Sequence, residues 1–206
     1  MERLFGSDSI LFKVLEKIAD FVILNLLWAI CCIPVVTIGA STTALYYVML
    51  KMVRNEESHV AKMFFKAFKQ NLKQGSILTI VFIAAGLLLY VDIKHIFTWQ
   101  TDVKTLLLGI FVGIIVAVLV IILYTFPLLA QFENTIANTM KNAFMIGIAN
   151  WPCTIVILVL NSIPIIVLVL VPYIFYAMLP FWILFGIAAI SFVNSKMLKN
   201  IFEKYM

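Results

Sequence analysis

The chain has 206 residues, of which 64% are hydrophobic and only 12% are charged, and its formal net charge is +5. A soluble domain keeps about a quarter of its residues charged to cover its surface, so this composition excludes a water-soluble fold and predicts that lipid is the outer solvent. The three cysteines and two histidines form no CxxC or Cys/His grouping, which argues against a zinc site and a disulfide framework. We therefore expect no metal and no cofactor.

Four long stretches of the chain carry no charged side chain. They are Phe21–Leu50, Ser76–Val91, Thr105–Gln131 and Ala143–Ser195. About 20 helical residues cross a ~30 Å hydrocarbon core, so the first and the last stretch are each long enough for two passes. The sequence predicts an all-α, polytopic helical membrane bundle of about six transmembrane helices, with residues 1–206 forming a single integral membrane domain.

The first part of the chain is expected to approach the membrane and enter it. Met1–Asp20 mixes apolar residues at helical spacing with charged ones, which predicts an amphipathic helix at the interface. Phe21–Ile33 enters the membrane, Pro34 breaks or bends the run, and the short segment Ala44–Val53 returns. Two interpretations stay open: a hairpin of two crossings, which we prefer, or a short re-entrant hairpin. In the corner, Gly39 is expected to take backbone angles that other residues avoid.

Glu57–Gln74 is predicted to form a second amphipathic helix on the cytoplasmic leaflet. Its apolar stripe consists of Val60, Phe64, Phe68 and Leu72. Its lysine face, within about 60° of arc at 100° per residue, consists of Lys62, Lys66, Lys69 and Lys73. Such a helix can bury its stripe in acyl chains while its lysines meet anionic lipid of the inner leaflet, at about 1 kcal/mol per lysine. Docking of a cytoplasmic partner is the alternative, and the two roles are compatible.

The rest of the chain alternates crossings with polar stretches. In order, these are a crossing at Ser76–Val91, a polar loop at Asp92–Lys104, a crossing at Thr105–Ala130, an interfacial stretch at Gln131–Asn150, and a last pair of crossings at Thr154–Val171 and Tyr173–Val193. Glu133 could form an ion pair with Lys66 or Lys69 and so join the two interfacial stretches. Thirteen basic residues fall on one side of this topology and two on the other, so the positive-inside rule predicts cytoplasmic N- and C-termini.

The spans carry little of the chemistry that marks a mechanism. No Asp, Glu, Lys, Arg or His lies in the middle of any predicted span, which argues against proton relays, voltage sensors and acid–base enzymes. Asn25, Thr37 and Asn161 are candidates to line a small polar cavity, although such groups also bond neighbouring helices as a packing device. Topology accounts for the net positive charge, so we expect no binding of nucleic acid.

Short segments spread over nearly the whole chain share a pattern with one known family. The pattern begins with Asp20. It continues through the segments Asn25–Trp28, Ile33–Ala40, Thr43–Tyr47, Phe64–Asn71 and Lys141–Ala143. Through them the chain resembles the YesL family of integral membrane proteins, whose biochemical function is unknown. Genes of that family often accompany carbohydrate ABC importers in Gram-positive bacteria.

The resemblance implies a plasma-membrane accessory or scaffold protein that acts with sugar ABC importer subunits in such a bacterium. It carries over no catalytic or ligand-binding residue. The alternative, from a different class, is a small transporter or channel for neutral solutes that works as an oligomer.

Overall fold

The computed structural model describes residues 10–98 and 104–205, and within them every regular element is a helix. In chain order these are α2 (Ile10–Cys31), the 3-10 turn η1 (Val35–Thr37), α3 (Ile38–Val53), α4 (Val60–Thr98), α5 (Lys104–Gln131), α6 (Ile136–Ala149), α7 (Trp151–Leu170), α8 (Pro172–Ala177), α9 (Leu179–Phe181), the π-helix η2 (Trp182–Gly186) and α10 (Ile187–Phe202). The predicted all-α architecture is confirmed.

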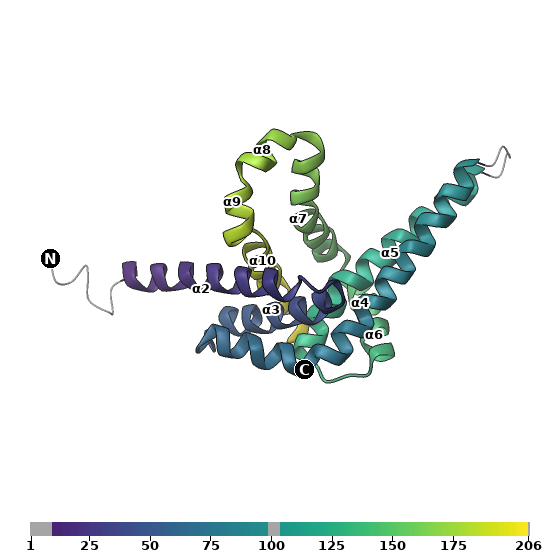
Figure 1. Ribbon diagram of the computed structural model, residues 1–206. Helices are drawn as coiled ribbons and strands as arrows, with labels where there is room; N and C mark the ends of the chain where they lie inside the picture. Colours follow the sequence, from purple (N-terminus) through teal and green to yellow (C-terminus); the bar gives the residue numbers. More distant parts are fainter. Residues whose placement is uncertain (1–9, 99–103, 206) are drawn as a thin grey trace.

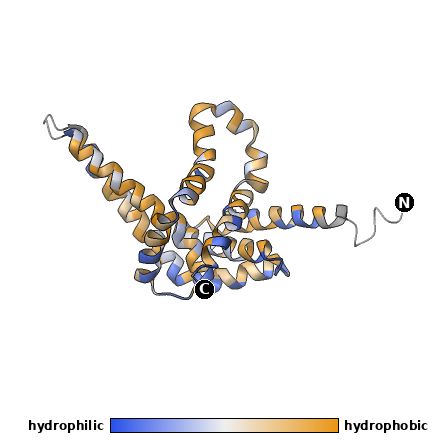
Figure 2. Ribbon diagram, turned by 180° about the vertical axis from the view of Figure 1, so that it is seen from behind, coloured by the Kyte–Doolittle hydropathy of each residue, from blue (hydrophilic) through white to orange (hydrophobic). Residues whose placement is uncertain are grey.

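Two helical hairpins rise from a layer of helices that we call the base (Figure 1). One hairpin consists of the second half of α4 and α5, and the other of α7 with α8 and α9. The base consists of α2, α3, residues 60–75 of α4, α6 and α10, and the C-terminus lies in it. Figure 2 shows hydrophobic colours along both hairpins and most of the hydrophilic colours on the base. This division of polarity is typical of hairpins that enter lipid and a base that faces water.

The predicted interfacial helix and the crossing that follows it are one continuous helix, α4, of 39 residues. Figure 1 shows that α4 changes direction between its two halves, so the base and the hairpin share this element. The predicted polar loop at Asp92–Lys104 is wrong in its first part, because α4 continues to Thr98. No Pro or Gly occurs between Asp92 and Thr98, and continued helix keeps the backbone hydrogen bonds satisfied at the edge of the bilayer.

Within the described residues, five helical segments are long and apolar enough to cross a membrane, one fewer than the six predicted. They are Val35–Val53, Val60–Ile96, Lys104–Gln131, Trp151–Leu170 and Leu179–Phe202. The segment Val35–Val53 is 61% buried inside the protein, whereas the windows in α4, α5 and α7 are 6–11% buried. Figure 1 shows α2 and α3 lying across the foot of the hairpins, which favours the short, re-entrant interpretation over two full crossings.

The apolar core lies in the base and where the hairpin helices join it. One cluster joins α2, α3, the start of α4 and α10 around Phe64 and Met49. A second joins α3, α5, α6, α7 and α10 around Tyr124 and Phe202. The hairpins instead expose large apolar side chains over much of their length, among them Leu88 and Leu170. The base is therefore held together by side-chain packing, and lipid covers the hairpins.

The descending arm of the second hairpin is irregular. Pro172 begins α8 and Pro180 lies within α9, where a missing N–H and a bulky ring interrupt a regular helix. The π-helix η2 follows directly and leads into α10. The prolines of this region are visible in the sequence, but nothing in the sequence indicates a π-helix.

Candidate functional site

The lysine face lies on the part of α4 that belongs to the base. All four side chains, Lys62, Lys66, Lys69 and Lys73, are exposed. None of them forms an ion pair with another residue of the described chain. The ion pairs found there join Lys17, Lys51 and Lys199 to glutamates. All four positions are helical and exposed, which agrees with the predicted lysine face, and a binding role for that face stays a prediction.

Most of the apolar stripe behind the lysines packs into protein. Val60 and Phe64 are buried, and Phe68 packs against the same cluster, whose other members come from α2, α3 and α10. The rings of Phe64 and Phe68 are stacked with centroids 6.3 Å apart. Leu72, the last residue of the stripe, is 41% exposed. The expectation that the stripe lies in acyl chains is therefore wrong for Val60, Phe64 and Phe68, because these residues pack against apolar side chains of α2, α3 and α10.

The two polar stretches of the base are joined, but not by the ion pair considered from the sequence. Between the described residues no ion pair links Glu133 with Lys66 or Lys69. Instead, Gln74 Nε2 donates a hydrogen bond to the backbone oxygen of Asn134, at 3.2 Å. This bond ties the segment before α6 to α4.

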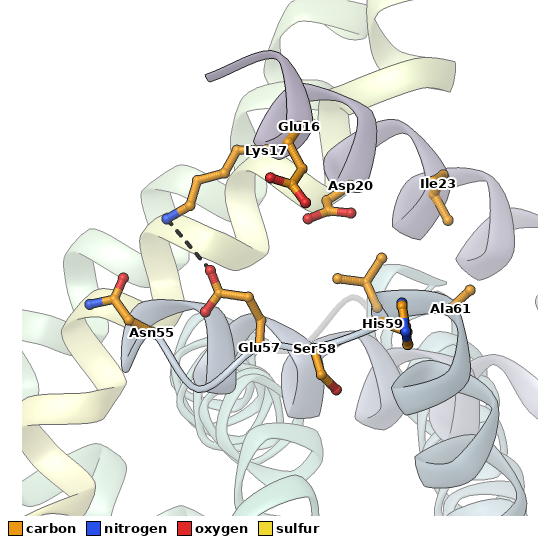
Figure 3. Close-up of a pocket in the computed structure, with 10 residues that line it drawn as sticks. Glu16, Lys17, Asp20, Ile23, Asn55, Glu57, Ser58, His59 and Ala61 are labelled. Carbon is orange, nitrogen blue, oxygen red and sulfur yellow. Dashed lines mark ion pairs between the residues drawn. The ribbon is translucent and has the colours of Figure 1, made fainter. Parts of the chain in front are cut away.

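An open pocket of about 790 Å³ lies between α2 and the loop that joins α3 to α4 (Figure 3). Glu16 and Asp20 line it from α2, and Glu57 lines it from the loop. Lys17 pairs with Glu57, with 3.7 Å between Nζ and Oε1. Burial raises the pKa of Asp20, the charges of Glu16 and Glu57 raise it further, and Lys17 lowers it. Asp20 therefore holds its proton more readily than a free carboxyl does.

Three carboxylates and a histidine line this pocket, but they are not arranged as a metal centre. His59 also lines it, but the described residues contain no group of three or more His, Cys, Asp or Glu side chains that could hold a metal ion. The sequence analysis missed the pocket, because its two walls come from segments that are about forty residues apart and share no motif.

Asn25 joins α2 to the π-helix. Its side chain is buried, and Nδ2 donates to the backbone oxygens of Trp182, at 3.2 Å, and Ile183, at 2.7 Å. Its Oδ1 accepts a hydrogen bond from the backbone N–H of Ala188, at 2.8 Å. A π-bulge interrupts the regular i to i+4 pattern and frees backbone groups, so one side-chain amide here satisfies three of them.

The other two cavity candidates form local bonds. Thr37 Oγ1 lies 2.6 Å from the backbone oxygen of Cys31 and 2.7 Å from that of Pro34, within the corner before α3. Asn161 Nδ2 donates to the oxygen of Ile157, one turn back in its own helix, at 2.7 Å. The hydrogen bonds of Asn25, Thr37 and Asn161 thus involve three separate sets of partners. A cavity lined by all three stays a prediction.

Buried hydroxyl and amide groups join helices of the base to one another and to the hairpin helices α5 and α7, and these groups were not predicted from the sequence. Tyr124 Oη and Thr154 Oγ1 are 2.8 Å apart, and Thr154 Oγ1 also donates to the backbone oxygen of Gly147, at 2.7 Å. Asn194 Nδ2 donates to Tyr46 Oη, at 3.1 Å. The only available signal was a polar residue in an apolar run, which does not reveal its partner.

Comparison with known proteins matches the same region that builds most of the base. A family model described as "Protein of unknown function, DUF624" matches residues 21–93. The chain is 25% identical to the uncharacterized protein YesL of Bacillus subtilis (strain 168) over 151 aligned residues. The aligned region covers 71% of this chain and 70% of that protein. The chain is similar to the YesL family. No solved structure matches it.

The resemblance to YesL expected from the sequence is thus confirmed. The family model spans Asn25, all of α3 and the lysine face of α4. Together with the apolar helices, the Bacillus relative fits a multi-pass membrane protein of a Gram-positive bacterium.

Proposed function

We propose that this chain is a plasma-membrane accessory or scaffold protein that acts with the subunits of a carbohydrate importer. The observation that carries the proposal is the construction of the base. The apolar stripe of α4 packs inward, so the lysine face is held outward on a rigid support. A surface of this kind suits a protein that binds others. The link to carbohydrate import comes from the YesL resemblance.

The membrane contact of the base is assigned to α2. Val14, Leu15 and Ile18 of α2 are exposed apolar side chains on the same helix as Glu16 and Lys17. An amphipathic helix of this kind lies in the interface of a bilayer. In this arrangement α2 contacts the anionic inner leaflet, and the first half of α4 is available to other partners.

The base is placed in the cytoplasm. Most basic residues of the described chain belong to it, whereas Lys94 and Lys104 lie near the tip of the α4–α5 hairpin. We expect a cysteine at position 98, in a background without Cys31, Cys32 and Cys153, to react with an impermeant maleimide in intact cells. A cysteine at position 70 should react only after the membrane is opened. Labelling at position 70 in intact cells would overturn this orientation.

Co-purification tests the proposed function. The tagged protein is expressed from its own locus, cross-linked in intact cells and purified, with an equally abundant tagged multi-pass protein as the control. Importer subunits should be enriched with this chain and not with the control, and deletion of the gene should lower sugar uptake. No enrichment together with unchanged uptake would refute the scaffold role. Solute flux through the pure protein in liposomes would favour the transporter alternative instead.

A further inference from the structure

We infer that the lysine face of α4 docks an acidic segment of a cytosolic protein. We call the surface the docking ridge and define it as Lys62, Phe65, Lys66, Lys69, Leu72 and Lys73. The inference rests on the proposed function in one respect, since it gives the chemistry of the partner that a scaffold would bind.

The docking ridge is held on a rigid support. Its helix buries Val60, Phe64 and Ala67 in the core cluster that also contains α2 and α3 residues. Packing of this kind fixes both the axial position and the rotation of the helix. The lysine stems therefore leave the protein at set spacings, and less ordering is needed when a partner binds.

The ridge carries apolar anchors as well as charge. Phe65 and Leu72 are 44% and 41% exposed. They are seven residues apart, which is about 10 Å along the helix, and they border the lysine arc at 100° per residue. Protein interfaces concentrate their binding energy in a few large side chains surrounded by polar groups. A partner helix with an apolar residue every two turns and acids beside them matches this pattern.

The charge of the ridge calls for acidic groups on the partner. Four lysines of one sign lie within about three turns, and none pairs with an acid in the described chain. Like charges at this spacing repel one another, so acids of a partner relieve a cost that the isolated protein bears.

The position of the ridge favours a protein over lipid. A helix that lies on a leaflet inserts its apolar face among acyl chains, but here Val60, Phe64 and Ala67 of that face are inside the base, and Phe65 and Leu72 are left at its edge. In Figures 1 and 2, which share the same vertical axis, the first half of α4 lies below α3, and α2 lies above α3 on the side of the hairpins. The ridge helix is thus on the side of the base away from the membrane that the hairpins enter.

Binding of a designed acidic peptide tests the chemistry of the ridge. The full-length protein is placed in nanodiscs of phosphatidylcholine, and the probe is a fluorescein-labelled helix with leucines seven residues apart flanked by glutamates. Lys66→Glu/Lys69→Glu should weaken binding about tenfold or more, and so should Phe65→Ser/Leu72→Ser. Lys141→Glu/Lys204→Glu changes the net charge equally at exposed lysines elsewhere and should leave binding unchanged. Equal effects of the two charge reversals would overturn the inference.

Two further measurements separate the inference from its alternatives. A bimane fluorophore at position 70 should be quenched by nitroxide-headgroup lipid in anionic nanodiscs much less than one at position 15 of α2, and equal quenching would place the ridge on lipid and refute the docking role. Importer subunits, if they co-purify with the wild type and with Lys141→Glu/Lys204→Glu, should be lost with Lys66→Glu/Lys69→Glu. If the importer subunits are retained by the wild type and by both double variants, the scaffold role stands, but the inference that the docking ridge binds a partner is overturned. If no subunit co-purifies at all, the scaffold role fails. The peptide measurement alone then decides whether the docking ridge binds an acidic segment.

Discussion

Replacing Gly39 with alanine should sharply reduce the folded yield, whereas Gly86→Ala should leave it unchanged. A Cβ at position 39 would lie 2.5 Å from the backbone oxygen of Gly75, 2.5 Å from Thr79 Oγ1 and 2.6 Å from the ring of Phe126. The Gly39 N–H also donates to Thr79 Oγ1, at 2.9 Å, so α3 and α4 cannot separate without losing this bond. Overpacking of a tight site costs about 1–3 kcal/mol, and valine should cost more than alanine.

The matched control uses the same substitution at an exposed glycine of α4. A Cβ at Gly86 meets nothing within 4 Å, and alanine is the better helix former there. Gly75→Ala should behave like Gly39→Ala, because its Cβ would lie 2.6 Å from the backbone nitrogen of Ala40. Folded yield is measured by fluorescence-detected size exclusion of a GFP fusion in detergent, with the thermal midpoint as a second readout. Similar midpoints for all three variants would show that the α3–α4 crossing tolerates a methyl group.

The importance of Gly39 could be predicted from the sequence, but its cause could not. No glycine in the described chain has a positive φ, so backbone freedom is not the reason. The reason is that two helix backbones approach each other at Gly39 and Gly75, which lie 36 positions apart. A substitution at the neighbouring Ala40 would be a poor control for Gly39→Ala, because Ala40 is fully buried at the same crossing. The exposed Gly86 is the better control.

Hydropathy predicted what lies inside the membrane better than what lies inside the protein. The crossing predicted at Thr105–Ala130 agrees with α5 to within one residue at each end. The stripe of α4 was correctly identified as apolar and helical, but its partner was wrong. Periodicity shows that a face must leave water, and it cannot distinguish acyl chains from a neighbouring helix such as α3. Only the three-dimensional arrangement assigns that face to the core.

Asn25 shows the same limit for a polar residue. An asparagine in an apolar run indicates that some partner must exist, because an unpaired amide is costly there. Its partners lie 157 to 163 positions away, in a segment whose π-helical form has no sequence pattern that we recognised. The proline breaks at Pro172 and Pro180 marked the region as irregular but did not connect it with α2.

Replacing Asn25 with leucine should destabilise the protein strongly, whereas Asn161→Leu should have little effect. Leucine has the same branching and the same number of side-chain heavy atoms as asparagine, but it is bulkier and leaves the oxygens of Trp182 and Ile183 and the N–H of Ala188 without their side-chain partner. A buried polar backbone group that loses its partner costs about 1–3 kcal/mol, so the sum is several kcal/mol unless the π-helix rearranges. Within the described residues, the hydrogen bond of the Asn161 side chain goes to the carbonyl of Ile157, one turn back in its own helix.

The two substitutions are chemically identical and both lie in apolar helices, so their difference isolates the π-helix contact. The thermal midpoint in detergent should fall much further for Asn25→Leu than for Asn161→Leu. Hydrogen exchange gives the local readout: in Asn25→Leu, amides in a peptide covering residues 182–188 should exchange faster than those of α5, because the amide of Ala188 loses its acceptor. If both variants melt together and exchange in 182–188 is unchanged, then Asn25 does not hold the π-helix, and α10 is positioned by its side-chain packing against the neighbouring helices.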